Sequence, residues 1–286
     1  MVGYFHVCTH GGKLPWMFQD DEDFIMGINR VAICKHLTDV KVLNFILMDN
    51  HIHLLIHSDF LSCKTFINKF KLMYGKWVNH KYGTISHLKH LSTEIIRINN
   101  MNQLLKVIAY IDRNSIKAGF NSLPTYYPWG GAKYLFSKGY EKEFNHKVSD
   151  LSRNEQIIRL RTKNKLPQDW LVDGNFMINP CCFLDTNATH SLIQTPNKYI
   201  YHLSQKIEGE IEQMYSHTDN TFIPDKELRV IISKILADQF GVDSVKFLNA
   251  KDRMLIAKTL RYEYGSTLKQ ISRLLSVNLE ALKNFV

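Results

Sequence analysis

The sequence has few cysteines and no long apolar run. No two of its five cysteines have the spacing of a zinc ribbon or a CxxC redox pair. No stretch of about 18 apolar residues occurs, and the N-terminus has no basic segment leading into an apolar one. These absences argue against a disulfide framework, a secretion signal and a membrane span, and they predict a reduced, cytoplasmic compartment.

A phosphate-binding P-loop is also missing, so the sequence predicts no nucleotide cofactor. Disorder is excluded, because 45% of the 286 residues are hydrophobic and 12% are aromatic. A chain of this length and composition is expected to bury a packed core and to form about two domains.

The net charge of +9 is unevenly distributed. Residues 60–137 carry eleven basic and two acidic residues, with no acid from Phe60 to Thr93, and residues 246–286 carry eight and three. The remaining segments are slightly acidic. Clustered lysine and arginine release counterions from nucleic acids, so two polyanion-binding surfaces are predicted, although solvated faces would give the same composition.

The first half of the chain alternates strand and helix patterns. Strands are expected at 4–9, 42–48, 51–57 and 94–98, and helices at 20–36, 62–82 and 101–117. The order β-α-β-β-α-β-α predicts an α+β fold, an antiparallel sheet with helices packed on it in the ferredoxin-like style.

The second half is predicted to be simpler. Residues 138–198 are polar and irregular, and we interpret them as a connecting segment. Residues 199–286 are expected to form a helical domain, with a helix-turn-helix at 246–286. Its candidate packing residues are Ile271, Leu274, Val277 and Leu282.

Two pairs of side chains have spacings that could bring chemical groups together. On a strand, His51 and His53 project from one face about 7 Å apart, within reach of one divalent cation, although such a pair is more often structural. On a helix, Tyr110 and Asn114 share a face, although a single helical tyrosine usually packs. The combination therefore matters more than either pair.

Three segments resemble a known family in their order along the chain. They are LMDNHIHLLIH around His51 and His53, YIDRNSIKAG from Tyr110, and Tyr127-Pro128-Trp129. Together they resemble the HUH-superfamily single-tyrosine transposases, of the insertion-sequence and REP-associated tyrosine transposase type. The chain departs from the family pattern at Asp49, Ser115 and Gly130-Gly131, none of which is a proposed ligand or nucleophile. The resemblance covers residues 4–136.

The resemblance implies an HUH nuclease domain over residues 1–137 with particular residue roles. His51, His53 and Asn114 would hold a divalent metal, Mg²⁺ or Mn²⁺, and Tyr110 would be the nucleophile. The implied enzyme cleaves and rejoins single-stranded DNA through a 5′-phosphotyrosine during DNA transposition. Its implied partner is single-stranded or hairpin DNA, in a cytoplasmic, nucleoid-associated setting, and the choice between a monomer and a homodimer stays open.

Basic side chains on three predicted elements are candidates for binding DNA phosphates. They are Lys64, Lys69, Lys71 and Lys76 on the acid-free helix, Lys106, Arg113 and Lys117 on the Tyr110 helix, and Lys269, Arg273 and Lys283 near the C-terminus. Two alternatives stay open. One is a domesticated DNA-binding relative that acts as a repressor or structural factor, and the other is an HUH initiator of replication or transfer.

Overall fold

The computed structural model describes residues 1–9, 16–83, 88, 91–205, 225–262, 264, 266 and 268–285. The chain divides into two compact units, Met1–Ile211 and Glu212–Val286. No helix in this described part is both long and apolar enough to cross a bilayer.

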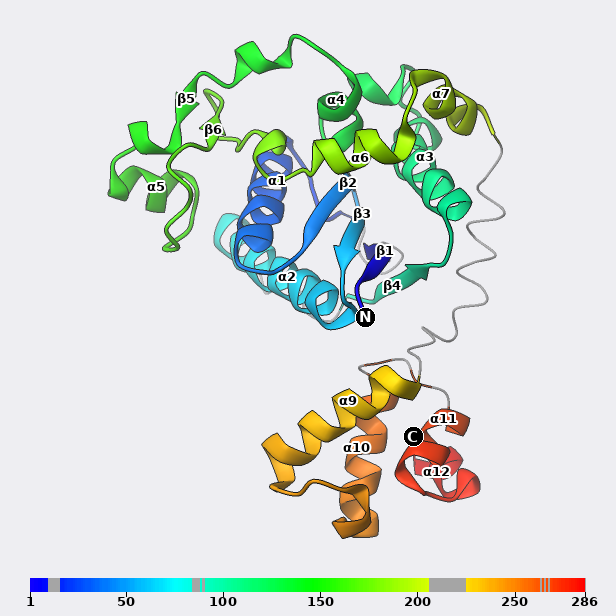
Figure 1. Ribbon diagram of the computed structural model, residues 1–286. Helices are drawn as coiled ribbons and strands as arrows, with labels where there is room; N and C mark the ends of the chain where they lie inside the picture. The colour runs from blue at the N-terminus through cyan, green and yellow to red at the C-terminus, as the bar shows by residue number, and fades with distance from the viewer. Residues whose placement is uncertain are drawn as a thin grey trace. The chain divides into compact units, whose positions relative to one another are not determined.

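A four-stranded antiparallel sheet forms the centre of the first unit (Figure 1). Its strands, in the spatial order β2-β3-β1-β4, are β1 (Gly3–Thr9), β2 (Lys41–Met48), β3 (His51–Ser58) and β4 (Thr93–Ile98). The three long helices are α1 (Asp21–His36), α2 (Phe60–Tyr82) and α3 (Met101–Lys117). The predicted α+β class and element order are confirmed.

Side-chain caps fix the starts of these helices. Asp20, Asp59 and Asn100 each accept a hydrogen bond from the backbone N–H three residues later, at the first turns of α1, α2 and α3. Gly83 ends α2 with a φ of 63°, a left-handed conformation that suits glycine. These local signals explain why the boundaries lie close to those predicted.

The two faces of the sheet are covered by different helices. Phe5 contacts Phe60 of α2, and Gly27 of α1 lies against Leu47, so α1 and α2 cover one face. Tyr110 of α3 contacts His6 on the opposite face. The alternation predicted for β3 therefore sends Ile52, Leu54 and Ile56 toward α1 and α2 and sends the histidines toward α3.

The segment 138–198 is not a linker, and the prediction for it is wrong. It belongs to the first unit, which extends to Ile211, so the predicted boundary at 199 is also displaced. The unit contains the helices and strands α4 (Gly131–Phe136), β5 (His146–Lys147), α5 (Arg153–Arg159), β6 (Leu171–Val172), α6 (Thr186–Ile193) and α7 (Pro196–Ser204), with 3₁₀ turns at Pro124–Tyr126, Tyr140–Glu143, Val148–Asp150 and Pro180–Cys182.

Buried hydrogen bonds explain why this segment is fixed. Asn29 of α1 donates to Phe176 O and accepts from Ile178 N, at 2.9 and 2.7 Å. Thr189 of α6 donates to Leu43 O on β2 at 2.8 Å. Scattered apolar side chains of the segment, Phe144, Val148, Leu160, Ile178 and Phe183, are buried. The sequence did not reveal these isolated buried residues, because polar residues separate them along the segment.

The second unit is helical, as predicted. Its elements are α9 (Asp225–Ile235), a π-helical turn (Leu236–Phe240), a 3₁₀ turn (Val245–Phe247), α10 (Ala250–Tyr262), α11 (Leu268–Leu275) and α12 (Leu279–Phe285). Ile271, Leu274 and Leu282 are buried, and Val277 is partly exposed. The assignment of these helices as a DNA-binding helix-turn-helix stays a prediction.

Candidate functional site

The strand order brings β1 alongside the predicted histidine strand. Cys8 of β1 is paired in register with His53 of β3 on one side and with Glu94 of β4 on the other. Residues paired in this way point to the same face, so His6 and Cys8 join His51 and His53 beneath α3.

The histidine side chains lie in direct contact with one another. His6 Nε2 and His53 Nδ1 are 3.0 Å apart, a hydrogen bond whose donor depends on the tautomers. The rings of His51 and His53 are nearly perpendicular, with centroids 4.8 Å apart. His51 Nδ1 lies 2.6 Å from Asn50 Oδ1, so the turn residue orients this ring.

Tyr110 stands edge-on over the histidines. Its ring centroid is 5.6 Å from that of His53 and 5.8 Å from that of His6, and its residue is 7% exposed. The tyrosine and the histidine pair, 57 residues apart in sequence, therefore meet within one chain. Their meeting requires no second copy.

Asn114 lies one helical turn after Tyr110 and is mostly buried. Its amide nitrogen donates to the backbone carbonyls of Tyr110 and Ile111, at 2.8 and 3.3 Å. Because the amide nitrogen is used in this way, the amide oxygen is the atom that a ligand role would require.

Three side chains form a group that could hold a metal ion. One donor atom each from His6, Cys8 and His53 lies within 4.8 Å of the others, and all three residues are buried. Burial lowers the pKa of His6 to about 3, so its imidazole is neutral and has a lone pair to offer. Two imidazoles and a sulfur ligand suit Zn²⁺ best, and Mn²⁺ accepts imidazole more readily than Mg²⁺, which prefers oxygen ligands.

The sequence analysis missed His6 and Cys8. Their signal was present, because Tyr4, His6 and Cys8 alternate along the first strand. What the alternation alone did not reveal is that β1 lies between β3 and β4, next to the histidine pair.

A buried carboxyl anchors the tyrosine helix. Asp112 of α3 accepts from Asn44 Nδ2 of β2 at 2.8 Å and from the Tyr199 hydroxyl of α7 at 2.7 Å. Complete burial raises the pKa of Asp112 to about 7 despite these two hydrogen bonds, which favour the charged form. This group ties α3 to the sheet and to the C-terminal end of the first unit.

The Tyr127-Pro128-Trp129 motif closes the outer edge of β2. The Tyr127 hydroxyl donates to Leu47 O at 2.9 Å, and Leu47 N donates to Trp129 O at 2.9 Å. The Trp129 ring stacks on Phe24 of α1 with centroids 4.9 Å apart. In this structure the motif therefore contacts the scaffold that carries the histidines.

The basic residues predicted to bind DNA divide between the two faces. Lys64, Lys69, Lys71 and Lys76 lie on α2, across the sheet from Tyr110, whereas Lys106, Arg113 and Lys117 share α3 with it. The basic residues that were predicted to surround the tyrosine therefore form two separate groups, one on α2 and one on α3.

Several of these basic side chains have structural partners. Lys71 is 8% exposed and donates to Leu91 O and Thr93 Oγ1, each at 3.0 Å, so its prediction as a phosphate contact is not supported. Arg113 donates to Leu203 O of α7. In the second unit Arg273 pairs with Asp225, and the side chains of Lys269 and Lys283 lie outside the part that the structure describes.

The comparisons with known proteins say what the chain is similar to. Residues 28–114 match the model of the family described as transposase IS200 like, which confirms the resemblance seen in the sequence. The matched segment runs from α1 to α3 and includes His51, His53, Tyr110 and Asn114.

A solved structure of a REP-associated tyrosine transposase bound to a REP hairpin is also similar to the chain. The two share 14% identity and a TM-score of 0.36, over 47% of this chain and 79% of that one. No curated protein matches the chain.

Proposed function

We propose that the protein is a transposase that cleaves and rejoins single-stranded DNA through Tyr110, and that it recognises hairpin or repeat DNA. One observation carries the proposal: the Tyr110 ring lies against the imidazoles of His6 and His53 in the same chain. The match of residues 28–114 to the IS200-like transposases supports it.

In the proposed reaction the Tyr110 hydroxyl oxygen attacks a DNA phosphorus. An O–P bond to tyrosine forms, the P–O3′ bond breaks, and the phenol proton ends on the departing 3′-oxygen. A 3′-hydroxyl later attacks the phosphotyrosine in the reverse sense and releases the tyrosine. The phosphodiester energy is kept in the covalent link, so strand transfer requires no nucleotide.

A divalent cation fits the residues present. His51, His53 and Asn114 are the proposed ligands, and His6 and Cys8 extend the donor set. The imidazole and amide ligands are neutral, so even with a Cys8 thiolate the ion would keep a net positive charge, with which it would polarise the scissile phosphate when bound. Of the two ions expected from the sequence, Mn²⁺ accepts nitrogen and sulfur donors more readily than Mg²⁺.

The test is a covalent adduct between the full chain and labelled single-stranded DNA that carries a hairpin. With Mn²⁺ we expect a band of reduced mobility on a denaturing gel, absent with chelator and absent from Tyr110→Phe. Tyr126→Phe is the matched control, because Tyr126 is 67% exposed and lies outside the histidine cluster. An adduct that survives Tyr110→Phe would contradict the assignment of the nucleophile.

The adduct gel separates the first alternative, and an assay for joining of two transposon ends separates the second. A domesticated DNA-binding relative would shift the hairpin on a native gel and form no adduct under any metal condition. A replication or transfer initiator would form the adduct through the same tyrosine, but it would not join the cleaved strand to a second transposon end.

A further inference from the structure

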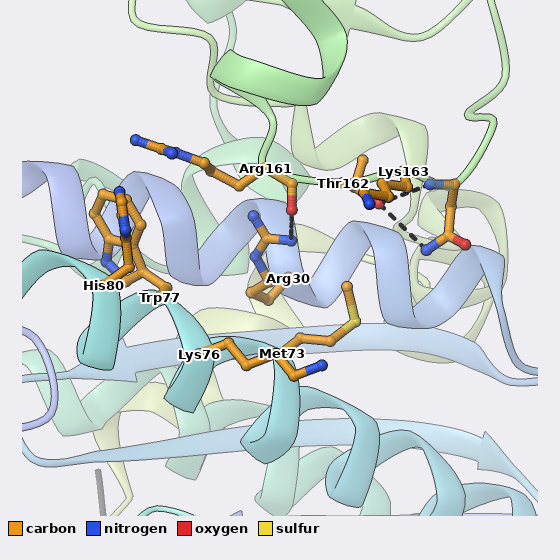
Figure 2. A pocket seen from close by; sticks show the side chains of 9 residues that line it. Arg30, Met73, Lys76, Trp77, His80, Arg161, Thr162 and Lys163 are labelled. Atoms are coloured by element: carbon orange, nitrogen blue, oxygen red, sulfur yellow. Dashed lines mark hydrogen bonds between the residues drawn. The ribbon is translucent and has the colours of Figure 1, made fainter. Parts of the chain in front are cut away.

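A hollow of about 250 Å³ lies on the face of the sheet opposite Tyr110, between α1, α2 and the loop that follows α5 (Figure 2). Five basic side chains line it: Arg30, Lys76, His80, Arg161 and Lys163. None of the lining residues is acidic. We call this hollow the Arg30 pocket.

Arg30 is a buried cation with no carboxylate partner among the described residues. It is 2% exposed, and its guanidinium donates to Leu160 O at 2.7 Å, to Arg161 O at 3.1 Å and to Met26 Sδ at 2.8 Å. Its buried Nε has no hydrogen-bond partner. A buried charge with only neutral acceptors is costly, and an anion in the adjoining pocket would offset that cost.

The loop that supplies Arg161 and Lys163 is held in place by hydrogen bonds to its backbone. Arg161 has a φ of 51°, a left-handed conformation unusual for a residue with a side chain, and Arg30 bonds its carbonyl. Arg153 donates to the carbonyls of Lys163 and Asn164. The Arg161 guanidinium lies over the Trp77 ring, 5.8 Å from its centroid. Two of the five basic side chains therefore project from a preorganised loop, and the other three project from helices α1 and α2.

Asp23, the acidic residue that accepts a hydrogen bond from the pocket residue Trp77, already has a cationic partner. Asp23 accepts from Trp77 Nε1, from Lys81 Nζ and from the Tyr82 hydroxyl, at 3.0, 3.0 and 2.6 Å. Its carboxylate pairs with Lys81 and makes no ion pair with Arg30.

We propose that the Arg30 pocket binds a phosphate group of a nucleic-acid strand on the face opposite Tyr110. Guanidinium and ammonium groups are the usual protein partners of phosphate, and several on one wall favour an anion over any neutral ligand. The proposal rests on the proposed function, which supplies the nucleic acid. It gives a role to Lys76, which lies on the face of the sheet opposite Tyr110. It also adds residues 161–163, which lie beyond the family match.

The test measures the affinity of the full chain for fluorescent hairpin-bearing single-stranded DNA at several salt concentrations. The variant is Lys76→Glu with Lys163→Glu, both at exposed positions, so folding is preserved. The control is Lys142→Glu, an exposed lysine on another loop. Circular dichroism melting confirms that each protein is folded.

We expect the double variant to bind about tenfold more weakly or worse, and to lose about 0.7 from the salt slope for each phosphate contact. Affinity and slope equal to those of Lys142→Glu would overturn the proposal. Inorganic phosphate tests the other source of the anion: if it raises the melting temperature of the wild type while the double variant binds DNA normally, the pocket takes free phosphate and the nucleic-acid proposal is wrong.

The outcome is distinguishable from failure of the proposed function. Covalent adduct formation measures the activity of Tyr110, whereas the salt dependence of DNA affinity measures the phosphate contacts of the Arg30 pocket. A wild type that binds DNA with the expected slope but forms no adduct would contradict the transposase proposal and leave the pocket supported.

Discussion

At the scale of single residues, the site combines groups that sequence spacing reveals with groups that only the sheet reveals. His51, His53, Tyr110 and Asn114 were predicted from periods of two and four, and the structure places the tyrosine ring against His53. His6 and Cys8 reach the same face because β1 pairs with β3. Pairing between distant strands is a property of the folded chain, so no local pattern contains it.

Cys8 makes a testable contribution to metal binding. We expect Co²⁺ added to the full chain to give a sulfur-to-cobalt charge-transfer band in the near ultraviolet, because a thiolate that binds Co²⁺ shows this absorption. Cys8→Ser should lose the band and bind Co²⁺ more weakly. Cys181→Ser, at a partly exposed thiol of the same unit, should keep it. Equal spectra for both variants would show that Cys8 is not a ligand.

At the scale of elements, the sequence predicted the sheet and its three long helices because the apolar residues of each element recur with a regular period. The three helices also begin at residues whose side chains cap them. The prediction failed for 138–198, where single apolar residues such as Phe144 and Ile178 are separated by polar ones. These isolated apolar residues do not recur at a regular spacing, so no helix or strand pattern reveals them. Asn29, which bonds Ile178, and Leu43, which bonds Thr189, lie more than a hundred residues earlier, so these contacts were not visible from local sequence.

The close packing of α4 against β2 predicts that a larger residue at Gly131 destabilises the fold. Gly131 is one of the two glycines that depart from the family pattern. A Cβ at Gly131 would overlap Asn44 Oδ1 and lie 3.2 Å from Phe45 N, and Asn44 holds Asp112. We therefore expect Gly131→Ala to destabilise the first unit by about 1–3 kcal/mol.

The matched variant is Gly130→Ala, whose Cβ would come no closer than 3.4 Å to any neighbour. Urea unfolding followed by tryptophan fluorescence measures both. Gly131→Ala should shift the midpoint to lower urea, and Gly130→Ala should change it little. If both variants unfolded at the wild-type midpoint, the close approach of α4 to β2 would be wrong.

At the scale of the whole molecule, the basic residues of the 60–137 block lie on separate surfaces of the first unit. The excess in residues 60–137 is divided by the sheet, with the α3 cations on the Tyr110 face and Lys76 on the Arg30 pocket. The charge blocks were visible in the sequence. Their division into two faces follows from the packing of α2 and α3 on opposite sides of the sheet.

The extent of the first unit predicts how the chain can be shortened. A fragment of residues 1–211 should unfold cooperatively, because it contains its own core and the partners of Asp112 and Arg30. A fragment of residues 1–137 should not, because it removes Tyr199 from Asp112, the two backbone acceptors from Arg30 and both partners from Asn29, at about 1–3 kcal/mol for each unmade hydrogen bond. Thermal melting by circular dichroism compares the two. A stable, cooperative 1–137 would restore the boundary that the sequence suggested.

The central claim is that Tyr110 becomes linked to DNA. The most direct measurement is mass spectrometry of the wild-type adduct, formed on hairpin-bearing single-stranded DNA with Mn²⁺ and digested with protease and nuclease. We predict a peptide that contains Tyr110 and carries a nucleotide phosphate on that tyrosine. A nucleotide found on any other side chain, or no linked peptide from a protein that binds the same DNA, would contradict the claim.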